Sequence, residues 1–307
     1  MPKSRAAKPG AERRRFKPDV IFTFSANDNA PSLMDFLRDA MPDRKRTTIK
    51  DYLKYRQVMV NGVITTQWNH PLNPGDIVKV NISREFQTFK NPRLHIVYED
   101  DDIIVVNKGY GLLSVGTDNL KEGTAYWLLR DYVKRVDLRN KIFIVHRLDQ
   151  HTSGLMVFAK TEEAKRALQR NWNNMVLERR YVAVVEGQID PPDGTVDSWL
   201  AENSAHEVYS TGKEGVGQRA VTHYHTLKSR GRFSMVELQL STGRKNQIRV
   251  HMKDIGHPIV GDRRYGAGPS PIHRLALHAM TLRFIHPITR KDMNFTSPLP
   301  PGFSKLV

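Results

Sequence analysis

One ten-residue segment, HRLDQHTSGL at 146–155, contains the carboxylate whose surroundings most favour chemistry. Asp149 follows Arg147, a permanent cation, and precedes a Thr-Ser-Gly turn. The residues on both sides, 142–145 and 155–159, are apolar and favour buried strands. We therefore expect Asp149 in a short polar loop, where a rigid scaffold holds a reactive side chain at the surface of a cleft.

Other kinds of site are less well supported by this loop. A metal site would use His146, Asp149 and His151, but their spacing is not a typical ligand pattern. Ser153 lacks the glycine-flanked elbow of a serine hydrolase. A glycosidase would need a second carboxylate in a matching context, and none stands out. A plain ion pair of Asp149 with an arginine stays open at this point.

Two further segments contain residues that could face the same cleft. Tyr181, in ERRYVAVVEG, lies on a predicted strand, where it either packs in the core or offers a flat wall for a nucleobase. Arg244, in LSTGRKNQIRVHMKD, lies between a predicted strand and a predicted helix. Its guanidinium either caps a surface turn or keeps a partner carboxylate ionised.

The composition restricts the class of protein. The 307 residues include 48 Lys and Arg against 32 Asp and Glu, a formal net charge of +16, which favours a polyanionic partner such as RNA. No cysteine is present, which excludes disulfides, zinc–thiolate sites and a thiol nucleophile. No apolar run reaches the roughly 18 residues of a membrane helix. We expect a cytoplasmic location and a monomer. We also expect no cofactor, because no phosphate-binding glycine loop is present.

The order of patterns predicts four regions. Residues 1–30 form a basic, flexible arm, 31–83 a small module, 84–92 a linker and 93–307 one large domain. In the small module, Asn61-Gly62 between two apolar runs predicts a hairpin. In the large domain, predicted strands outnumber helices and do not alternate with them, which indicates an α+β fold with a mixed, largely antiparallel sheet. Its helices are expected at 124–134, 162–171 and 245–254.

The small module resembles an S4-type RNA-binding domain. The resemblance rests on Leu33–Leu37, on a basic helix at Arg46–Tyr55 and on the segment QVMVNGVITT…NPGDIVKV. It implies RNA binding led by the phosphate backbone. The residues expected to make these contacts are Arg44, Lys45, Arg46, Lys50 and Lys54.

The large domain resembles the RluA/RluD-type family of RNA pseudouridine synthases over roughly residues 96–303. The matching segments, in order, are VYEDDDIIVVNKGYGLL, HRLDQHTSGLMVFAKT, RRYVAVVEG and TGRKNQIRVHMKDIGHPIVGDRRYG. The family usually has Lys-Pro where this chain has Lys108-Gly109, and Thr-His where it has Lys245-Asn246. These departures affect a loop and the contacts to RNA, and hence the target site.

The resemblance implies an isomerase that converts uridine to pseudouridine within RNA, without cofactor or metal. It makes Asp149 the catalytic carboxylate, Tyr181 the stacking residue, and Arg244 the cation paired with Asp149. Ile248 packs against the pocket, and Arg147 and Thr152 support the loop. The S4-type module favours ribosomal RNA over tRNA. The alternatives are a non-catalytic RNA-binding protein of the same fold and a sugar-active hydrolase, which would not explain the net charge of +16.

Overall fold

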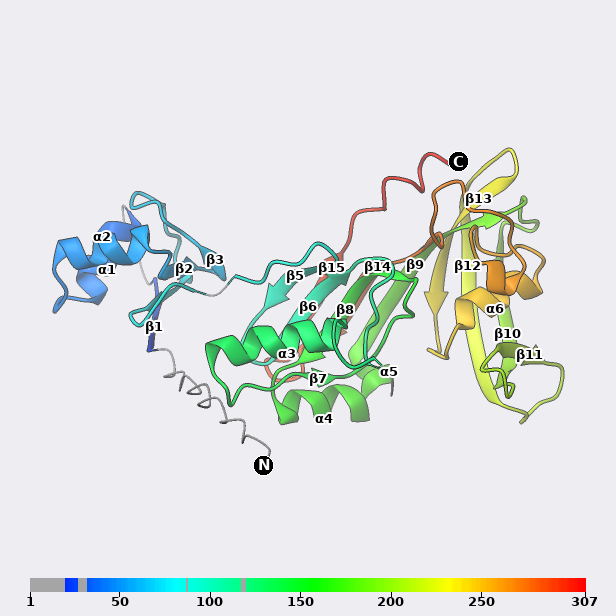
Figure 1. Ribbon diagram of the computed structural model, residues 1–307, viewed down its shortest axis with the longest axis horizontal. Helices are drawn as coiled ribbons and strands as arrows, with labels where there is room; N and C mark the ends of the chain where they lie inside the picture. The colour runs from blue at the N-terminus through cyan, green and yellow to red at the C-terminus, as the bar shows by residue number, and fades with distance from the viewer. Residues whose placement is uncertain (1–19, 27–31, 87, 117–119) are drawn as a thin grey trace, which may run out of the picture. The chain divides into compact units, whose positions relative to one another are not determined.

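The computed structural model describes residues 20–26, 32–86, 88–116 and 120–307 (Figure 1). Contacts group the chain into two compact units: residues 1–88 with 132–140, and residues 89–131 with 141–307. Residues 1–19, most of the predicted arm, lie outside the described residues. No helix of the described residues is long and apolar enough to cross a membrane.

The first unit packs two short helices on a small antiparallel sheet. The helices are α1 (Leu33–Ala40) and α2 (Arg46–Lys54). The strand order is β1 (Ile21–Ser25), β4 (Ile77–Asn81), β2 (Val58–Val60) and β3 (Val63–Ile64). The predicted hairpin at Asn61-Gly62 is confirmed, because both residues have left-handed φ angles of 47° and 82° between β2 and β3.

The first strand corrects the predicted extent of the N-terminal arm. Residues 21–25 were included in the arm, but β1 pairs along its whole length with β4, from Ile21 opposite Asn81 to Ser25 opposite Ile77. From Phe22 to Ser25 the segment alternates apolar and polar residues, and Phe24 packs against the core of the unit. This alternation is the pattern of a half-buried strand, so the folded unit begins before residue 31.

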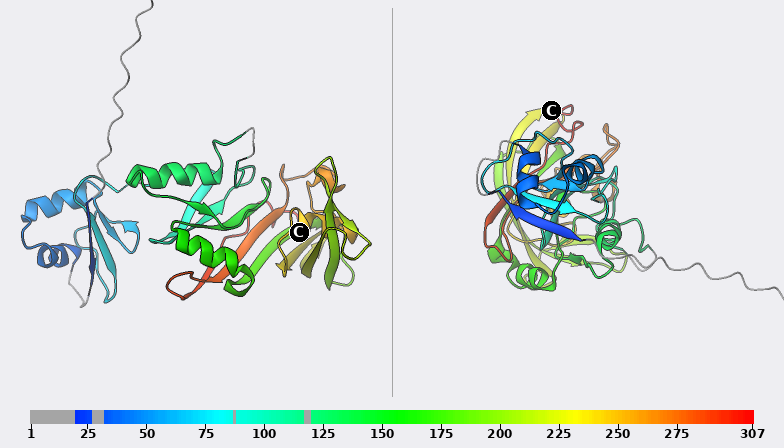
Figure 2. Two further views of the ribbon diagram at one scale, coloured as in Figure 1. Left: turned by 90° about the horizontal axis from the view of Figure 1, so that it is seen from below. Right: turned by 90° about the vertical axis from the view of Figure 1, so that its left-hand side faces the viewer.

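The second unit contains one 11-stranded sheet, and its strand order confirms the α+β fold with a largely antiparallel sheet. The order is β11-β10-β12-β13-β9-β14-β8-β6-β5, while β15 pairs with β14 and β7 pairs with β8. The β14–β8 pair is parallel, and the other pairs of this sheet are antiparallel. Figure 2 shows how the strand direction turns along the sheet, as expected for a twisted sheet. The bounds are β5 Leu94–Glu99, β6 Ile103–Lys108, β7 Phe143–Ile144, β8 Ser153–Ala159, β9 Val176–Glu186, β10 Asp193–Glu202, β11 Val208–Thr211, β12 Gln218–Arg230, β13 Phe233–Leu240, β14 Leu277–Ile285 and β15 Asp292–Thr296.

Helices are few in the second unit. They are α4 (Glu162–Arg170), α5 (Trp172–Met175) and α6 (Gln247–Asp254), with a short 3-10 helix at Arg263–Tyr265. Helix α3 (Ala125–Val136) begins in the second unit, and its last turn groups with the first. Ala164 and Leu168 of α4 are buried in one core cluster with strand residues such as Val157. This packing fixes β8, the strand that follows the segment containing Asp149.

Candidate active site

The loop that contains Asp149, residues 145–152, joins β7 to β8, and hydrogen bonds to its backbone hold it in place. Ser114 donates through Oγ to the carbonyl oxygen of Leu148 (2.6 Å), and the Leu148 amide donates back to that Oγ (3.1 Å). The Thr152 amide donates to the carbonyl oxygen of Asp149 (3.1 Å). Leu148 and Thr152 are both buried. The carboxylate of Asp149 therefore projects from a backbone that has little freedom.

A buried lysine at the end of β6 also holds this loop. Lys108 is fully buried, and its Nζ donates to the carbonyl oxygens of Gly109 (3.2 Å), Leu112 (2.8 Å) and Gln150 (3.1 Å). Burial lowers the pKa of Lys108 to about 7, while the charge of Asp149 opposes that shift. No role of Lys108 was predicted, although a lysine so close to the apolar run IIVV at 103–106 was a usable signal.

The chain has a glycine after Lys108 where the family usually has proline, and the local backbone explains this. The Gly109 amide donates to the carbonyl oxygen of Arg93 (2.7 Å), a bond that proline cannot make. A Cβ on Gly109 would lie 2.9 Å from the same oxygen. Glycine therefore lets β5 and β6 stay close at this edge, so the departure is local and leaves Lys108 in place.

The sheet register places Tyr181 beside the Asp149 loop. Gly154 lies opposite Ala279 in the parallel β8–β14 pair, and Ala279 lies opposite Tyr181 of β9. Gly154 has a φ of 120°, and a Cβ there would lie 2.2 Å from the carbonyl oxygen of Ala279. Glycine is therefore required at the start of β8, directly after the loop. The pairing of β8 with β14 and of β14 with β9 then fixes the position of Tyr181.

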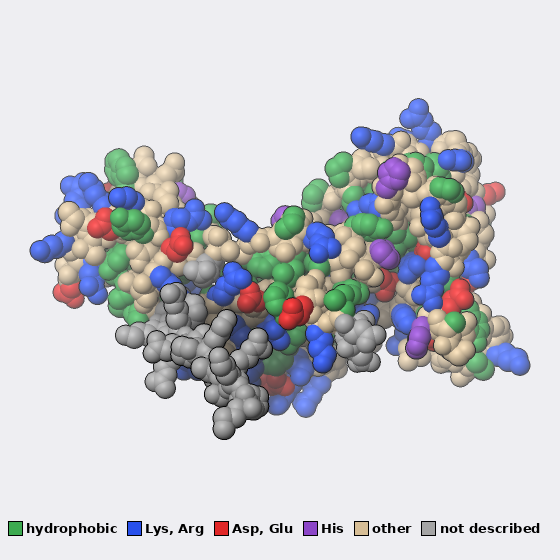
Figure 3. All heavy atoms as spheres, viewed as in Figure 1, with side chains coloured by type: hydrophobic (Ala, Val, Ile, Leu, Met, Phe, Trp, Pro, Cys, Tyr) green, Lys and Arg blue, Asp and Glu red, His purple; other side chains and the backbone are tan. Residues whose placement is uncertain are grey.

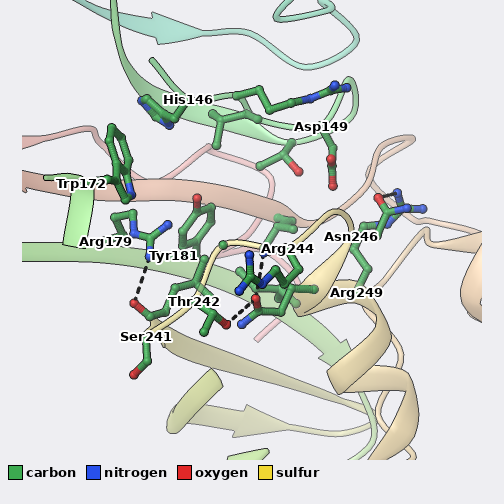
Figure 4. Close-up of a pocket in the computed structure, with 18 of the residues that line it drawn as sticks. His146, Asp149, Trp172, Arg179, Tyr181, Ser241, Thr242, Arg244, Asn246 and Arg249 are labelled. Carbon is green, nitrogen blue, oxygen red and sulfur yellow. Dashed lines mark hydrogen bonds between the residues drawn. The ribbon is translucent and has the colours of Figure 1, made fainter. Parts of the chain in front are cut away.

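One cavity of about 380 Å³ brings the predicted site residues together (Figure 4). This volume is in the range of small-molecule sites, large enough for a nucleoside to be considered. Tyr181 is 9% exposed and Ile248 is 5% exposed, and both form its walls. The predicted residues that line it are Arg147, Asp149, Thr152, Tyr181, Arg244 and Ile248. The five cations predicted to bind RNA belong to the first unit instead.

Opposing effects act on the pKa of Asp149. Burial has the largest effect and raises this pKa above its ordinary value, and the positive charges of Arg249, Arg147 and Lys108 offset part of that rise. Asp262 raises it further as a like charge. The carboxylate is thus held in a confined site in which three cations favour its ionised form.

The structure corrects the cation assigned to Asp149. Arg244 is exposed, and its Nε donates to the carbonyl oxygen of Arg219 (3.2 Å). Among the described residues, Arg249 is the cation with the largest effect on Asp149, and Arg244 is not one of those that shift its pKa. The reason is that α6 begins at Gln247 rather than at the predicted residue 245, so Arg249 lies in its first turn and Arg244 in the turn before it.

Arg249 is held by an ion pair with a second buried carboxylate. Its Nε and Nη2 donate to the two carboxylate oxygens of Asp262, at 2.6 and 2.7 Å. Its Nη1 donates to Oδ1 of Asn246 (2.8 Å). Asn246, which replaces the family's usual histidine, has a left-handed φ of 54° at the start of α6. In the sequence, the position of Arg249 between the apolar residues Ile248 and Val250, both buried in the structure, was a signal for its role that the prediction missed.

His146, Trp172 and Arg179 form the cavity wall beyond Tyr181. The ring centroids of His146 and Trp172 are 4.8 Å apart, and the His146 Nε2 accepts a hydrogen bond from the Val157 amide (3.0 Å). Burial, together with the charge of Arg179, lowers the pKa of His146 to about 3, so its ring is neutral. The Cζ of Arg179 lies 5.9 Å from the ring of Trp172.

The candidate metal ligands of the sequence do not gather in this cavity. His146 and Asp149 line it, whereas the ring of His151 packs against Tyr110 at 5.2 Å. Among the described residues, the group with suitable spacing is Asp100, Asp102 and His286, none of which lines the cavity. Asp100 there accepts hydrogen bonds from Tyr98 (2.8 Å) and His286 (2.9 Å), which gives the group a structural explanation.

Comparison with known proteins agrees with the fold. The family described as RNA pseudouridylate synthase matches residues 102–254. The chain is 36% identical to the RNA pseudouridine synthase YlyB of Bacillus subtilis, over 94% of this chain and 97% of that protein. It is also 36% identical to ribosomal large subunit pseudouridine synthase D of Haemophilus influenzae, over 88% of each chain. The human RNA pseudouridylate synthase domain containing 4 structure covers 68% of this chain and 90% of its own, with a TM-score of 0.57 and 26% identity.

The fold, the cavity and these relatives define an enzyme class. The chain belongs to the RNA pseudouridylate synthase family, which confirms the resemblance to RluA/RluD-type enzymes. It is accordingly an RNA pseudouridine synthase, an isomerase that acts on uridine within RNA.

Proposed function

We propose that this enzyme isomerises a uridine of large-subunit ribosomal RNA, with Asp149 as the reacting carboxylate. The observation that carries the proposal is the confined cavity in which Asp149 lies among three cations, with Tyr181 in the wall. Two relatives support the ribosomal target, the synthases D of Haemophilus influenzae and Escherichia coli, both named for the large ribosomal subunit. A tRNA uridine is the alternative target.

The reaction fits a site of this size because it is an exchange of bonds within one nucleotide. The bond from ribose C1′ to N1 of uracil breaks, the base turns, and a bond from C1′ to C5 forms. The proton on C5 leaves and N1 gains a proton, so the reaction is redox-neutral. A uridine stacked in RNA hides this bond and must be flipped into the cavity, at a cost of about a few kcal/mol.

The cavity residues have separate roles in this proposal. Tyr181 stacks on the extruded uracil and keeps it from leaving while the bond is broken. Asp149 acts on the ribose, either by adding to C1′ or by removing a ribose proton. Arg249 keeps Asp149 ionised through its charge, and Ile248 packs against the base. The loop contacts of Leu148 and Lys108 fix the direction of the carboxylate.

The first unit supplies binding energy for the flip in this proposal, as an S4-type RNA-binding domain. The five cations of the predicted contact surface are all exposed, and the helix buries Ile49, Tyr52 and Leu53 on its other side. Arg46, Lys50 and Lys54 follow one another at four-residue intervals, so they share one face of α2. Lys and Arg side chains are also prominent on the face of the protein in Figure 3. We also propose that the enzyme acts as a monomer, and a ribosomal target would place it in the cytoplasm.

Mapping of pseudouridines tests the target directly. RNA from cells with and without this protein is compared at every uridine, and purified protein is then added to the RNA from the deficient cells. We expect one or a few large-subunit ribosomal positions to lose pseudouridine and to regain it with the enzyme. Loss confined to tRNA would overturn the ribosomal assignment, and no lost position with full RNA binding would favour the non-catalytic alternative.

A further inference from the structure

Arg179 of β9 is a half-buried guanidinium that has no anionic partner within the part of the chain that the structure describes. One hydrogen bond is formed by its Nη2, which donates to the carbonyl oxygen of Leu240 at 3.4 Å. Among the described residues, no ion pair includes Arg179; burial lowers its pKa, and the one titratable side chain that opposes this shift is Tyr181, whose hydroxyl is neutral at ordinary pH. A guanidinium has five N–H donors, and taking such a charge out of water is unfavourable unless an anion compensates it. Among the described residues, Arg179 therefore has no negative group paired with it.

The neighbouring arginine shows what a structural guanidinium looks like on the same strand. Arg180 pairs with Glu178 and lies 3.3 Å from Glu237, so two carboxylates satisfy it. Its side chain is 41% exposed, and it does not line the cavity. Because side chains alternate across a strand, Arg179 points to the opposite face from Arg180 and into the cavity. The two residues thus share charge and location in the sequence but differ in partner.

The surroundings hold Arg179 in position and leave its donors accessible from the cavity. Its Cζ lies 5.9 Å from the ring of Trp172, which His146 supports from 4.8 Å. The turn after β13 passes close to it: a Cβ on Gly243 would lie 2.6 Å from the Arg179 Nη1. Thr242 fixes this turn, since its Oγ1 donates to Gln247 (2.7 Å) and accepts from the Val221 amide (2.8 Å). In Figure 4, Arg179 and Trp172 lie on one side of Tyr181, and Asn246 and Arg249 on the other.

We propose that Arg179 binds a backbone phosphate of the substrate RNA next to the flipped uridine, and that this contact orients the uridine between Tyr181 and Asp149. This inference rests on the proposed function, since it assumes that RNA fills the cavity. A phosphodiester supplies the missing negative charge and accepts two parallel hydrogen bonds from a guanidinium. A uracil carbonyl oxygen lacks that charge and would leave Arg179 uncompensated.

The test compares Arg179→Gln with Arg180→Gln on a short RNA that contains a mapped target uridine. The dissociation constant is measured in the Asp149→Asn background, so that binding is read without turnover. The RNA is used unmodified and with an uncharged methylphosphonate linkage on the 5′ or the 3′ side of the uridine. Arg179→Lys keeps the charge, and urea unfolding of every variant reports whether the fold is intact.

We expect Arg179→Gln to weaken binding of unmodified RNA by about tenfold, the effect of one charge-assisted hydrogen bond. The slope of log K against log salt should fall by about 0.7, the value for one contact to single-stranded RNA. Arg180→Gln should stay within about twofold of the parent, and Arg179→Lys should keep the salt slope.

The modified RNA decides between a phosphate contact and other roles. With the uncharged linkage at the contacted side, Arg179→Gln should cause no further loss. An equal loss on modified and unmodified RNA would overturn the proposal, as would an unchanged salt slope. Absence of binding by the parent protein to any RNA would instead contradict the proposed function, which keeps the two failures apart.

Discussion

Lys108 donates a hydrogen bond to the carbonyl oxygen of Gln150, 3.1 Å away, so a buried ammonium group holds the residue that follows Asp149. The same Nζ binds the carbonyl oxygens of Gly109 and Leu112. A neutral amine has two N–H donors, one fewer than the three bonds require. The position of the loop that contains Asp149 and the protonation of Lys108 are therefore coupled.

Lys108 should give the protein a stability that rises with pH. Its pKa is about 7 in the folded chain against 10.5 ordinarily, so between these values the unfolded chain binds more protons. The free energy of unfolding then increases with pH, by at most about 1.4 kcal/mol for each pH unit. In Lys108→Met this contribution is absent. Urea unfolding of both proteins at several pH values measures it as the difference between the two curves.

An exposed lysine provides the control for that experiment. Lys253→Met, on the exposed side of α6, should keep the pH dependence of the parent protein. If the difference between the parent and Lys108→Met stays constant from about pH 7 to 10, the depressed pKa of Lys108 is wrong.

Arg249, rather than Arg244, should control the ionisation of Asp149. Its charge lowers the pKa of that carboxyl, so Arg249→Gln lets the pKa rise. Since the proposed function has Asp149 react as the ionised carboxylate, the acidic limb of the kcat profile should move to higher pH. Arg244→Gln should leave this limb in place, since Arg244 is not among the cations that act on Asp149. Equal shifts in the two variants would restore the pairing expected from the sequence.

The exposed face of α2 should contribute affinity that depends on salt. We expect a triple variant, Arg46→Gln, Lys50→Gln and Lys54→Gln, to bind RNA more weakly and to lower the salt slope by about two to three units. Its turnover number at saturating RNA should stay near that of the parent, because none of the three residues lines the cavity. Lys213→Gln, at an exposed position, is the control variant. An unchanged salt slope in the triple variant would show that α2 does not contact RNA.

The sequence was sufficient for the residues whose position follows from a local pattern. Asp149 lies in a polar loop between two apolar runs, and Tyr181 begins the apolar run YVAVV, which is part of a strand although β9 starts five residues earlier, at Val176. The Asn-Gly pair between two apolar runs also made the Asn61-Gly62 hairpin predictable. In each of these cases the signal extends over only a few residues, so no tertiary contact was needed.

Positions that depend on tertiary contacts were not predictable. Whether Arg244 or Arg249 approaches Asp149 depends on where α6 begins, and the left-handed Asn246 delays that start. The role of Lys108 depends on the burial of its ammonium among three carbonyl oxygens of other segments. Strands β10 and β15 were not predicted, because half or more of their residues are at least partly exposed and their apolar pattern is weak.

The most direct test of the central claim is tritium release from RNA that contains uridine labelled at C5, with the parent enzyme and with Asp149→Asn. Forming the bond to C5 must release that hydrogen to water, so the assay counts the reaction itself. We predict tritium release by the parent enzyme and none above background by Asp149→Asn, whose RNA affinity should stay within about twofold of the parent. The control variant Glu163→Gln, at an exposed site of α4, should behave as the parent. Near-parental release by Asp149→Asn would contradict the account.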